Sequence, residues 1–150
     1  MKNINKKVLP IIYILIISTT FGFIKNNNVI EVDLLRNGLI TINNDYVKKE
    51  NLCDSLCLHL LNHNYPGWSS PRNERELRKV VVSIASERSV PYEQYISISD
   101  EIEKAYLHAW NTISYKIYSS EFSSLTEKDK STVLNMLPKV ISEADPVLGK

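Results

Sequence analysis

The amino-acid sequence predicts an α/β domain in which helices pack on a short sheet, preceded by an apolar N-terminal segment. Three observations lead to this prediction. Residues 29–34 alternate apolar and polar side chains, as half-buried strands do, and residues 39–42 form a second short β-prone run. Residues 79–84 form a short run rich in β-branched side chains, and residues 92–118 repeat apolar side chains at helical spacing. A sheet covered by helices is the natural arrangement for elements in this order.

The N-terminal residues 1–28 indicate export across a membrane. Three lysines precede an uncharged run from Val8 to Ile24, which is at the lower limit for a spanning helix. A cleaved signal peptide has the same basic start, and the small residues 18–20 and Gly22 would suit its cleavage site. Apolar residues continue to Ile24, which favours a retained anchor. In both cases the lysines predict a cytoplasmic N-terminus. If the apolar segment is retained, it is an inner-membrane anchor and the domain that follows is periplasmic.

The first exported elements are two short strands. Residues 29–34 alternate in polarity, and Leu39–Ile42 is a second β-prone run. Asn37-Gly38 between them predicts a hairpin with a type I′ turn, because that turn needs positive φ at both central residues. Residues 43–45, Asn-Asn-Asp, then end the pattern.

A helix, a loop and a buried strand follow. Leucines and cysteines recur at three- and four-residue steps from Asn51, which predicts an amphipathic helix ending near His63. Residues 62–71 are rich in Pro, Gly and Ser and predict a loop. The run at 79–84 predicts a strand buried on both faces, in a parallel or central position.

Two helices complete the prediction. The longer one covers Tyr92–Tyr118, with Pro91 at its start. The stripe expected to face the core comprises Tyr95, Ile98, Ile102, Ala105, Tyr106, Ala109, Trp110, Ile113 and Ile117. The shorter helix begins after Thr126, an N-cap candidate, and stops near Leu137-Pro138. The predicted order is β-β-α-β-α-α, with a domain at 29–118 and a C-terminal extension with one helix at 119–150.

Composition excludes several classes of function. The 150 residues have a net charge of +1 with scattered charges, so no nucleic-acid surface is expected. The sequence has no glycine-flanked nucleophile and no phosphate-binding glycine loop, and its histidines have no evident partner. We therefore expect neither an enzyme nor a bound cofactor.

The two cysteines leave two alternatives open. Cys53, Cys57, His59 and His63 suggest a metal site, but at about 100° per residue a regular helix turns His59 by about 120° and His63 by about 80° away from Cys53, so one ion cannot reach all four. No metal is therefore expected. Cys53 and Cys57 lie on one helical face, where packed thiols are the simpler expectation. A disulfide between them remains an alternative in an oxidising compartment.

Aromatic residues are concentrated along the predicted long helix. Most of them should be core residues, but an excess of Tyr and Trp is also typical of partner-binding surfaces. The candidate interface residues are Val90, Pro91, Tyr92, Tyr95, Tyr106 and Trp110.

The order and spacing of these segments resemble the ExbD/TolR family. The matching segments are Ile30–Asn43 with Tyr46-Val47, the strand at 79–84, Val90-Pro91-Tyr92, Glu101-Ile102, Ala105-Tyr106, and the tail from Leu125-Thr126-Glu127 to Pro146. The tail is similar to the longer-tailed branch of the family. The resemblance spans Ile30 to Pro146, and its specificity comes from the order of the parts.

The resemblance implies a subunit of a TonB- or Tol-type energy-transducing transport complex. Its partners would be an ExbB/TolQ-like membrane protein and a TonB/TolA-like protein, and it would form a homodimer. The family's membrane helix carries a proton-relaying Asp, whereas Val8–Ile24 contains no titratable side chain that could take this role. We therefore expect a subunit that does not relay protons. The alternative is a soluble periplasmic binding, inhibitor or immunity protein released by signal-peptide cleavage.

Overall fold

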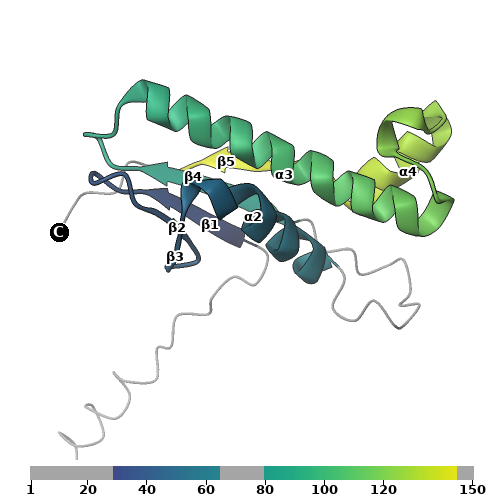
Figure 1. The fold of residues 1–150 in the computed structure, drawn as a ribbon, viewed down its shortest axis with the longest axis horizontal. Helices are drawn as coiled ribbons and strands as arrows, with labels where there is room; N and C mark the ends of the chain where they lie inside the picture. The colour runs from purple at the N-terminus through teal and green to yellow at the C-terminus, as the bar shows by residue number, and fades with distance from the viewer. Residues whose placement is uncertain (1–28, 65–79, 145–150) are drawn as a thin grey trace, which may run out of the picture.

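A computed structural model describes residues 29–64 and 80–144, which form one five-stranded sheet and its covering helices (Figure 1). The strand order is β3-β2-β1-β4-β5. The strands are β1 (Val29–Leu34), β2 (Ile40–Ile42), β3 (Asp45–Val47), β4 (Val81–Ser86) and β5 (Ile141–Glu143). The helical elements are α2 (Lys49–Asn64), α3 (Tyr92–Tyr118), the 3-10 turn η2 (Phe122–Ser124) and α4 (Glu127–Met136). The predicted mixed α/β class is confirmed.

The predicted anchor at residues 8–24 lies outside the described residues, as does most of the predicted loop at 62–71. Among the helices that the structure describes, none combines the length and the apolar character needed to cross a membrane.

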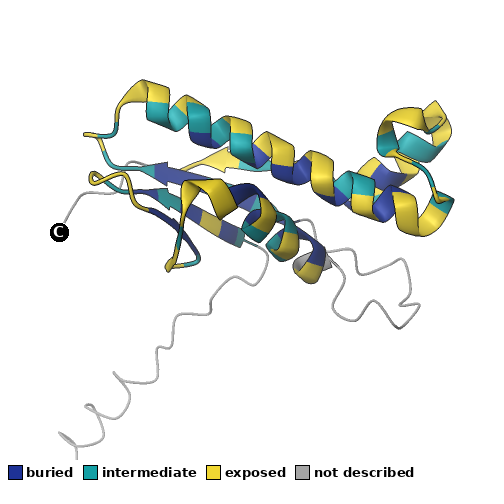
Figure 2. Ribbon diagram, viewed as in Figure 1, coloured by how far each residue is buried: buried dark blue, intermediate teal, exposed yellow. Residues whose placement is uncertain are grey.

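The core lies between the helices and one face of the sheet. Alternation along β1 places Ile30, Val32 and Leu34 on this face, all fully buried, while Glu31 on the opposite face is exposed. Val82 and Ile84 of β4 stand beside Ile30 and Val32 in the register and extend the same apolar face. Helix residues such as Leu56 and Ile102 pack against it in a single cluster. Figure 2 shows the buried residues on both the strands and the helices. The other face carries polar residues such as Ser83 and Ser142.

The central pair of strands is parallel. β1 pairs with β4 from Val29↔Val81 to Leu34↔Ser86, and β4 pairs with β5 in the same direction. Parallel neighbours need a long crossover connection, and α2 lies in the connection between β1 and β4. The loops that follow β1 and β4 therefore leave the sheet at the same end.

The hairpin is where the sequence predicts it, but the predicted turn type is wrong. Gly38 has φ +78 whereas Asn37 is not in the positive-φ region, so this is not a type I′ turn. The Gly38 amide donates to the Leu35 carbonyl, and the Leu35 amide donates to the Leu39 carbonyl. A turn followed by a glycine with positive φ is common in hairpin loops longer than two residues.

Two strands were missed by the predicted order β-β-α-β-α-α. Asn43 and Asn44, with φ of 52 and 75, form the tight turn with positive φ that leads into β3. β5 pairs with β4 at the other edge of the sheet. Each strand has only three residues, so neither contains enough alternation to be recognised in the sequence.

Two burial predictions also need correction. β4 is central and parallel, as predicted, but Val81 and Ser83 are only half-buried because helices cover one face alone. The bounds predicted for α3 are confirmed, and its buried stripe runs through Ile98, Ile102 and Ala109. Ile117, expected in the stripe, is 46% exposed.

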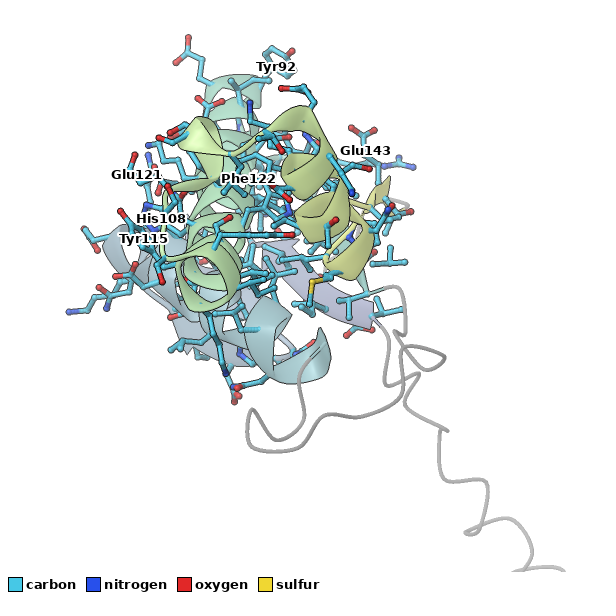
Figure 3. The ribbon with its side chains drawn as sticks, turned by 90° about the vertical axis from the view of Figure 1, so that its right-hand side faces the viewer. Tyr92, His108, Tyr115, Glu121, Phe122 and Glu143 are labelled. Carbon is cyan, nitrogen blue, oxygen red and sulfur yellow. The ribbon has the colours of Figure 1, made fainter. Side chains whose placement is uncertain are left out.

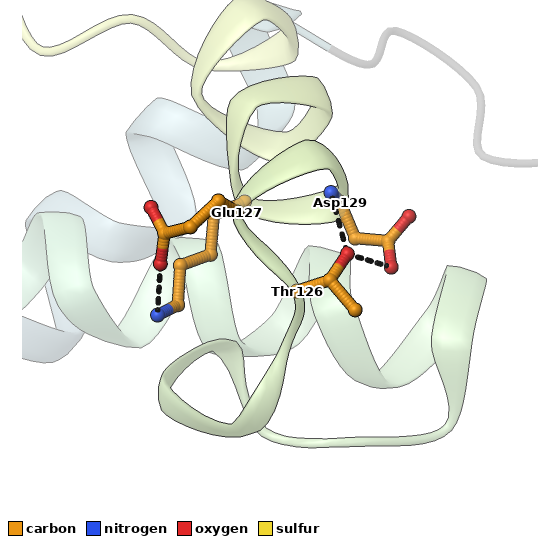
Figure 4. Close-up of polar contacts among 4 residues, drawn as sticks. Thr126, Glu127 and Asp129 are labelled. Carbon is orange, nitrogen blue, oxygen red and sulfur yellow. Dashed lines mark hydrogen bonds and ion pairs between the residues drawn. The ribbon is translucent and has the colours of Figure 1, made fainter.

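The C-terminal segment begins with a well-capped helix. Thr126 has extended backbone geometry, and its hydroxyl accepts a hydrogen bond from the Asp129 amide (Figure 4). Glu127 and Asp129 place negative charge in the first turn, where the helix dipole favours it. The N-cap predicted at Thr126 and the helix end at Leu137 are confirmed.

Thr126→Ala should lower the free energy of unfolding by about 1 kcal/mol, because the cap of α4 is lost. Chemical denaturation of the full chain measures this value. Thr132→Ala is the matched control, since the exposed Thr132 lies in the middle of α4 and bonds only to the Lys128 carbonyl. An equal loss in both variants would contradict a specific capping role.

Candidate functional site

The loops after β1 and β4 meet at one end of the domain. The Arg36 amide donates to the Glu87 carboxylate at 2.9 Å, and the Arg36 guanidinium Nε donates to Ser89 Oγ at 3.1 Å. The Glu87 amide donates to the Leu34 carbonyl at 3.0 Å. These bonds join segments about fifty residues apart, so both loops form one surface.

We call residues 36–39 and 88–92 the loop-end surface. It includes three of the predicted interface residues, Val90, Pro91 and Tyr92. Tyr92 is 74% exposed and Leu39 is 42% exposed, while Val90 packs partly against the core. Figure 3 shows the Tyr92 side chain extending away from the body of the domain. Exposed aromatic and aliphatic side chains beside arginines are the kind of surface that protein partners bind.

The other three predicted interface residues have structural partners inside the domain. Tyr106 is fully buried and donates to the Val140 carbonyl, so it cannot contact a partner. Trp110 donates its indole N–H to the Leu137 carbonyl at 2.9 Å and packs against Tyr106 and Phe122. Tyr95 donates to the Glu143 carboxylate at 2.7 Å. These three side chains attach the C-terminal segment to α3.

The segment predicted as a C-terminal extension shares the core of the domain. Val133 and Leu137 are buried in the main cluster, and β5 completes the sheet. The Phe122 amide donates to the Asn111 side chain, and Lys139 forms an ion pair with Glu103 at 2.8 Å. As far as residue 144, this segment is therefore part of the same folded unit.

Both cysteines are free thiols in the structure. Cys53 is buried in the main cluster and Cys57 is half-buried against it, as expected for packed thiols. Burial, with the neighbouring Cys53, raises the pKa of Cys57 to about 11. Burial also raises the pKa of Cys53, and the negative charges of Asp54 and Glu101 act in the same direction.

A histidine partner of Cys53 was missed by the sequence analysis. His108 Nδ1 lies 3.6 Å from Cys53 Sγ and 4.0 Å from Asp54 Oδ1. The expectation that the histidines have no partner is therefore wrong for His108, because α3 brings it to α2 across 55 residues. A nucleophilic cysteine needs a lowered pKa, and the pKa of Cys53 is shifted upward. In this triad the environment of Cys53 therefore favours the protonated thiol. The side chain of His63 lies outside the described residues.

No protein-family model and no curated protein matches this chain.

The free energy of unfolding should decrease between pH 9 and about 11. The thiol of Cys57 ionises near pH 9 in the unfolded chain but only near 11 in the folded one, so the unfolded state loses its proton first. The contribution of the protonated Cys57 thiol to stability is therefore complete below pH 9 and is lost as the pH rises through this interval.

Denaturation of the full chain at several pH values, under reducing conditions, measures the slope. Cys57→Ala should give a shallower decrease over this interval, whatever its effect on stability at pH 7. Tyr106, whose pKa burial raises to about 12, contributes equally to both variants. Parallel curves would mean that the pKa of the Cys57 thiol is no higher in the folded chain than in the unfolded chain.

Proposed function

We propose that this chain is an ExbD/TolR-like inner-membrane subunit of a TonB- or Tol-type energy-transducing complex. It is anchored by residues 8–24 and binds its protein partners through the domain that follows. It does not relay protons itself, since Val8–Ile24 contains no carboxylate. The ExbB/TolQ-like partner lies in the membrane, and the TonB/TolA-like partner reaches the periplasmic domain.

One observation carries most weight for the partner-binding part of this proposal. Two segments on which the resemblance rests, Arg36-Asn37-Gly38 and Val90-Pro91-Tyr92, lie far apart in the sequence but together form the loop-end surface. Their hydrogen bonds hold this surface in a defined shape before any partner arrives. A preorganised surface loses less conformational entropy on binding.

The chemistry of the loop-end surface supports binding to protein. Tyr92 offers a large aromatic side chain that is 74% exposed, and Arg88, four residues earlier, is also exposed. Tyrosine and arginine are among the residues that most often dominate the energy of protein interfaces. We therefore assign the TonB/TolA-like partner to this surface.

Tyr92→Ala should weaken binding of the TonB/TolA-like partner by about thirtyfold, because a central aromatic contact contributes roughly 2 kcal/mol. Calorimetry or fluorescence anisotropy with the full chain in detergent measures the dissociation constant. Tyr115→Ala is the matched control, since Tyr115 is 52% exposed near the other end of the same helix. Equal losses in both variants, or no loss in either, would exclude the loop-end surface as the binding site.

Fractionation of cells with intact-mass measurement tests the anchor. The proposal requires the full-length chain in the membrane fraction. A soluble product beginning near Phe23 would instead support a periplasmic binding, inhibitor or immunity protein.

In cells that lack their own ExbD, this chain alone should not restore gradient-dependent uptake. Restored uptake would show that it relays protons after all.

A further inference from the structure

Three potential metal ligands meet where α2 packs against α3. Cys53 and Asp54 come from α2, and His108 comes from α3. Their ligand atoms, one from each residue, all lie within 4.8 Å of one another. The Cys53 Sγ to His108 Nδ1 distance is 3.6 Å, and the His108 Nδ1 to Asp54 Oδ1 distance is 4.0 Å. Thiolate, imidazole and carboxylate are the three ligand types that zinc uses in proteins.

The sulfur–nitrogen distance agrees with the geometry that zinc requires. With a Zn–S bond of about 2.3 Å and a Zn–N bond of about 2.05 Å, tetrahedral coordination places the two ligand atoms about 3.5 Å apart. Cys53 and His108 are already at 3.6 Å. The same arithmetic gives about 3.3 Å between nitrogen and oxygen, so the Asp54 carboxylate has to approach His108 by less than 1 Å. Its side chain is 81% exposed and free to turn that far.

The surroundings of the cluster also suit a cation. Cys53 is 8% exposed and is held in place by the core, which fixes one ligand. The side chains of His108 (56% exposed) and Asp54 face solvent, which leaves an open side for entry of the ion and for a water ligand. Glu101 is a second negative charge near Cys53, and the cation Lys104 near it is paired with Glu101 at 2.6 Å.

We propose that Cys53, Asp54 and His108 bind one zinc ion, with water as the fourth ligand. The Cys53 thiol loses its proton to solvent as the Zn–S bond forms, and neutral His108 binds through Nδ1. The zinc ion then links α2 to α3, two helices whose ligands are 55 residues apart. The link stabilises the helix layer over the sheet. This site is separate from the loop-end surface, and the proposal does not depend on the proposed function.

Titration of the reduced, metal-free full chain in detergent with zinc alone tests the site. One zinc ion per chain should bind, and a hundredfold excess of free zinc over the dissociation constant should raise the melting temperature by about 10 °C. Cobalt, which gives a thiolate-to-metal charge-transfer band in the near ultraviolet, reports directly whether sulfur is a ligand.

Four variants distinguish this site from its neighbours. His108→Ala should weaken zinc binding at least about tenfold, and Cys53→Ala should weaken it about a hundredfold and abolish the cobalt band. His59→Ala and Cys57→Ala are matched controls on α2 and should bind within about twofold of the wild type. His108→Ala changes an exposed side chain, so it tests the site even if Cys53→Ala fails to fold. Unchanged binding in His108→Ala, or an equal loss in Cys57→Ala, would overturn the proposal.

Discussion

The parallel pairing of β1 with β4 is the interaction on which the rest of the domain depends. Its register from Val29↔Val81 to Leu34↔Ser86 places Ile30 and Val32 beside Val82 and Ile84, which creates one continuous apolar face. Parallel neighbours require a crossover, and α2 packs on that face within it. The same pairing brings the loop after β1 to the loop after β4, so it also builds the loop-end surface.

The second constraint is the packing of α2 against α3. Ala105 and Ala109 of α3 are fully buried in the core. The contact between the two helices places Cys53 next to His108, and Lys104 pairs with Glu101 in the same region. The same part of α3 also holds the C-terminal segment, through Tyr106 and Trp110 on either side of His108 in the sequence. One long helix thus joins the loop-end surface, the cysteine–histidine cluster and the tail of the domain.

Much of the fold could be predicted because its long elements have strong local patterns. The bounds of α3, the cap at Thr126 and the central position of β4 all follow from periodicity and capping chemistry within one segment. The short strands β3 and β5 could not be predicted in this way, because three residues have no measurable period. The turn type at Asn37-Gly38 was mispredicted for a related reason: Asn37-Gly38 and Asn43-Asn44 both favour positive φ, and loop length decides which pair adopts a tight turn.

The sequence by itself determined the fold class, the long helices and the apolar run at residues 8–24, because each depends on side chains that are neighbours along the chain. It also suggested Val90-Pro91-Tyr92 and the two cysteines as residues of interest. Only the tertiary structure decided which of these are accessible and what they contact. Tyr92 is exposed whereas Tyr106 is buried, although both are tyrosines on the same helix. His108 meets Cys53 because two helices pack side by side, and no pattern within either helix specifies its partner on the other.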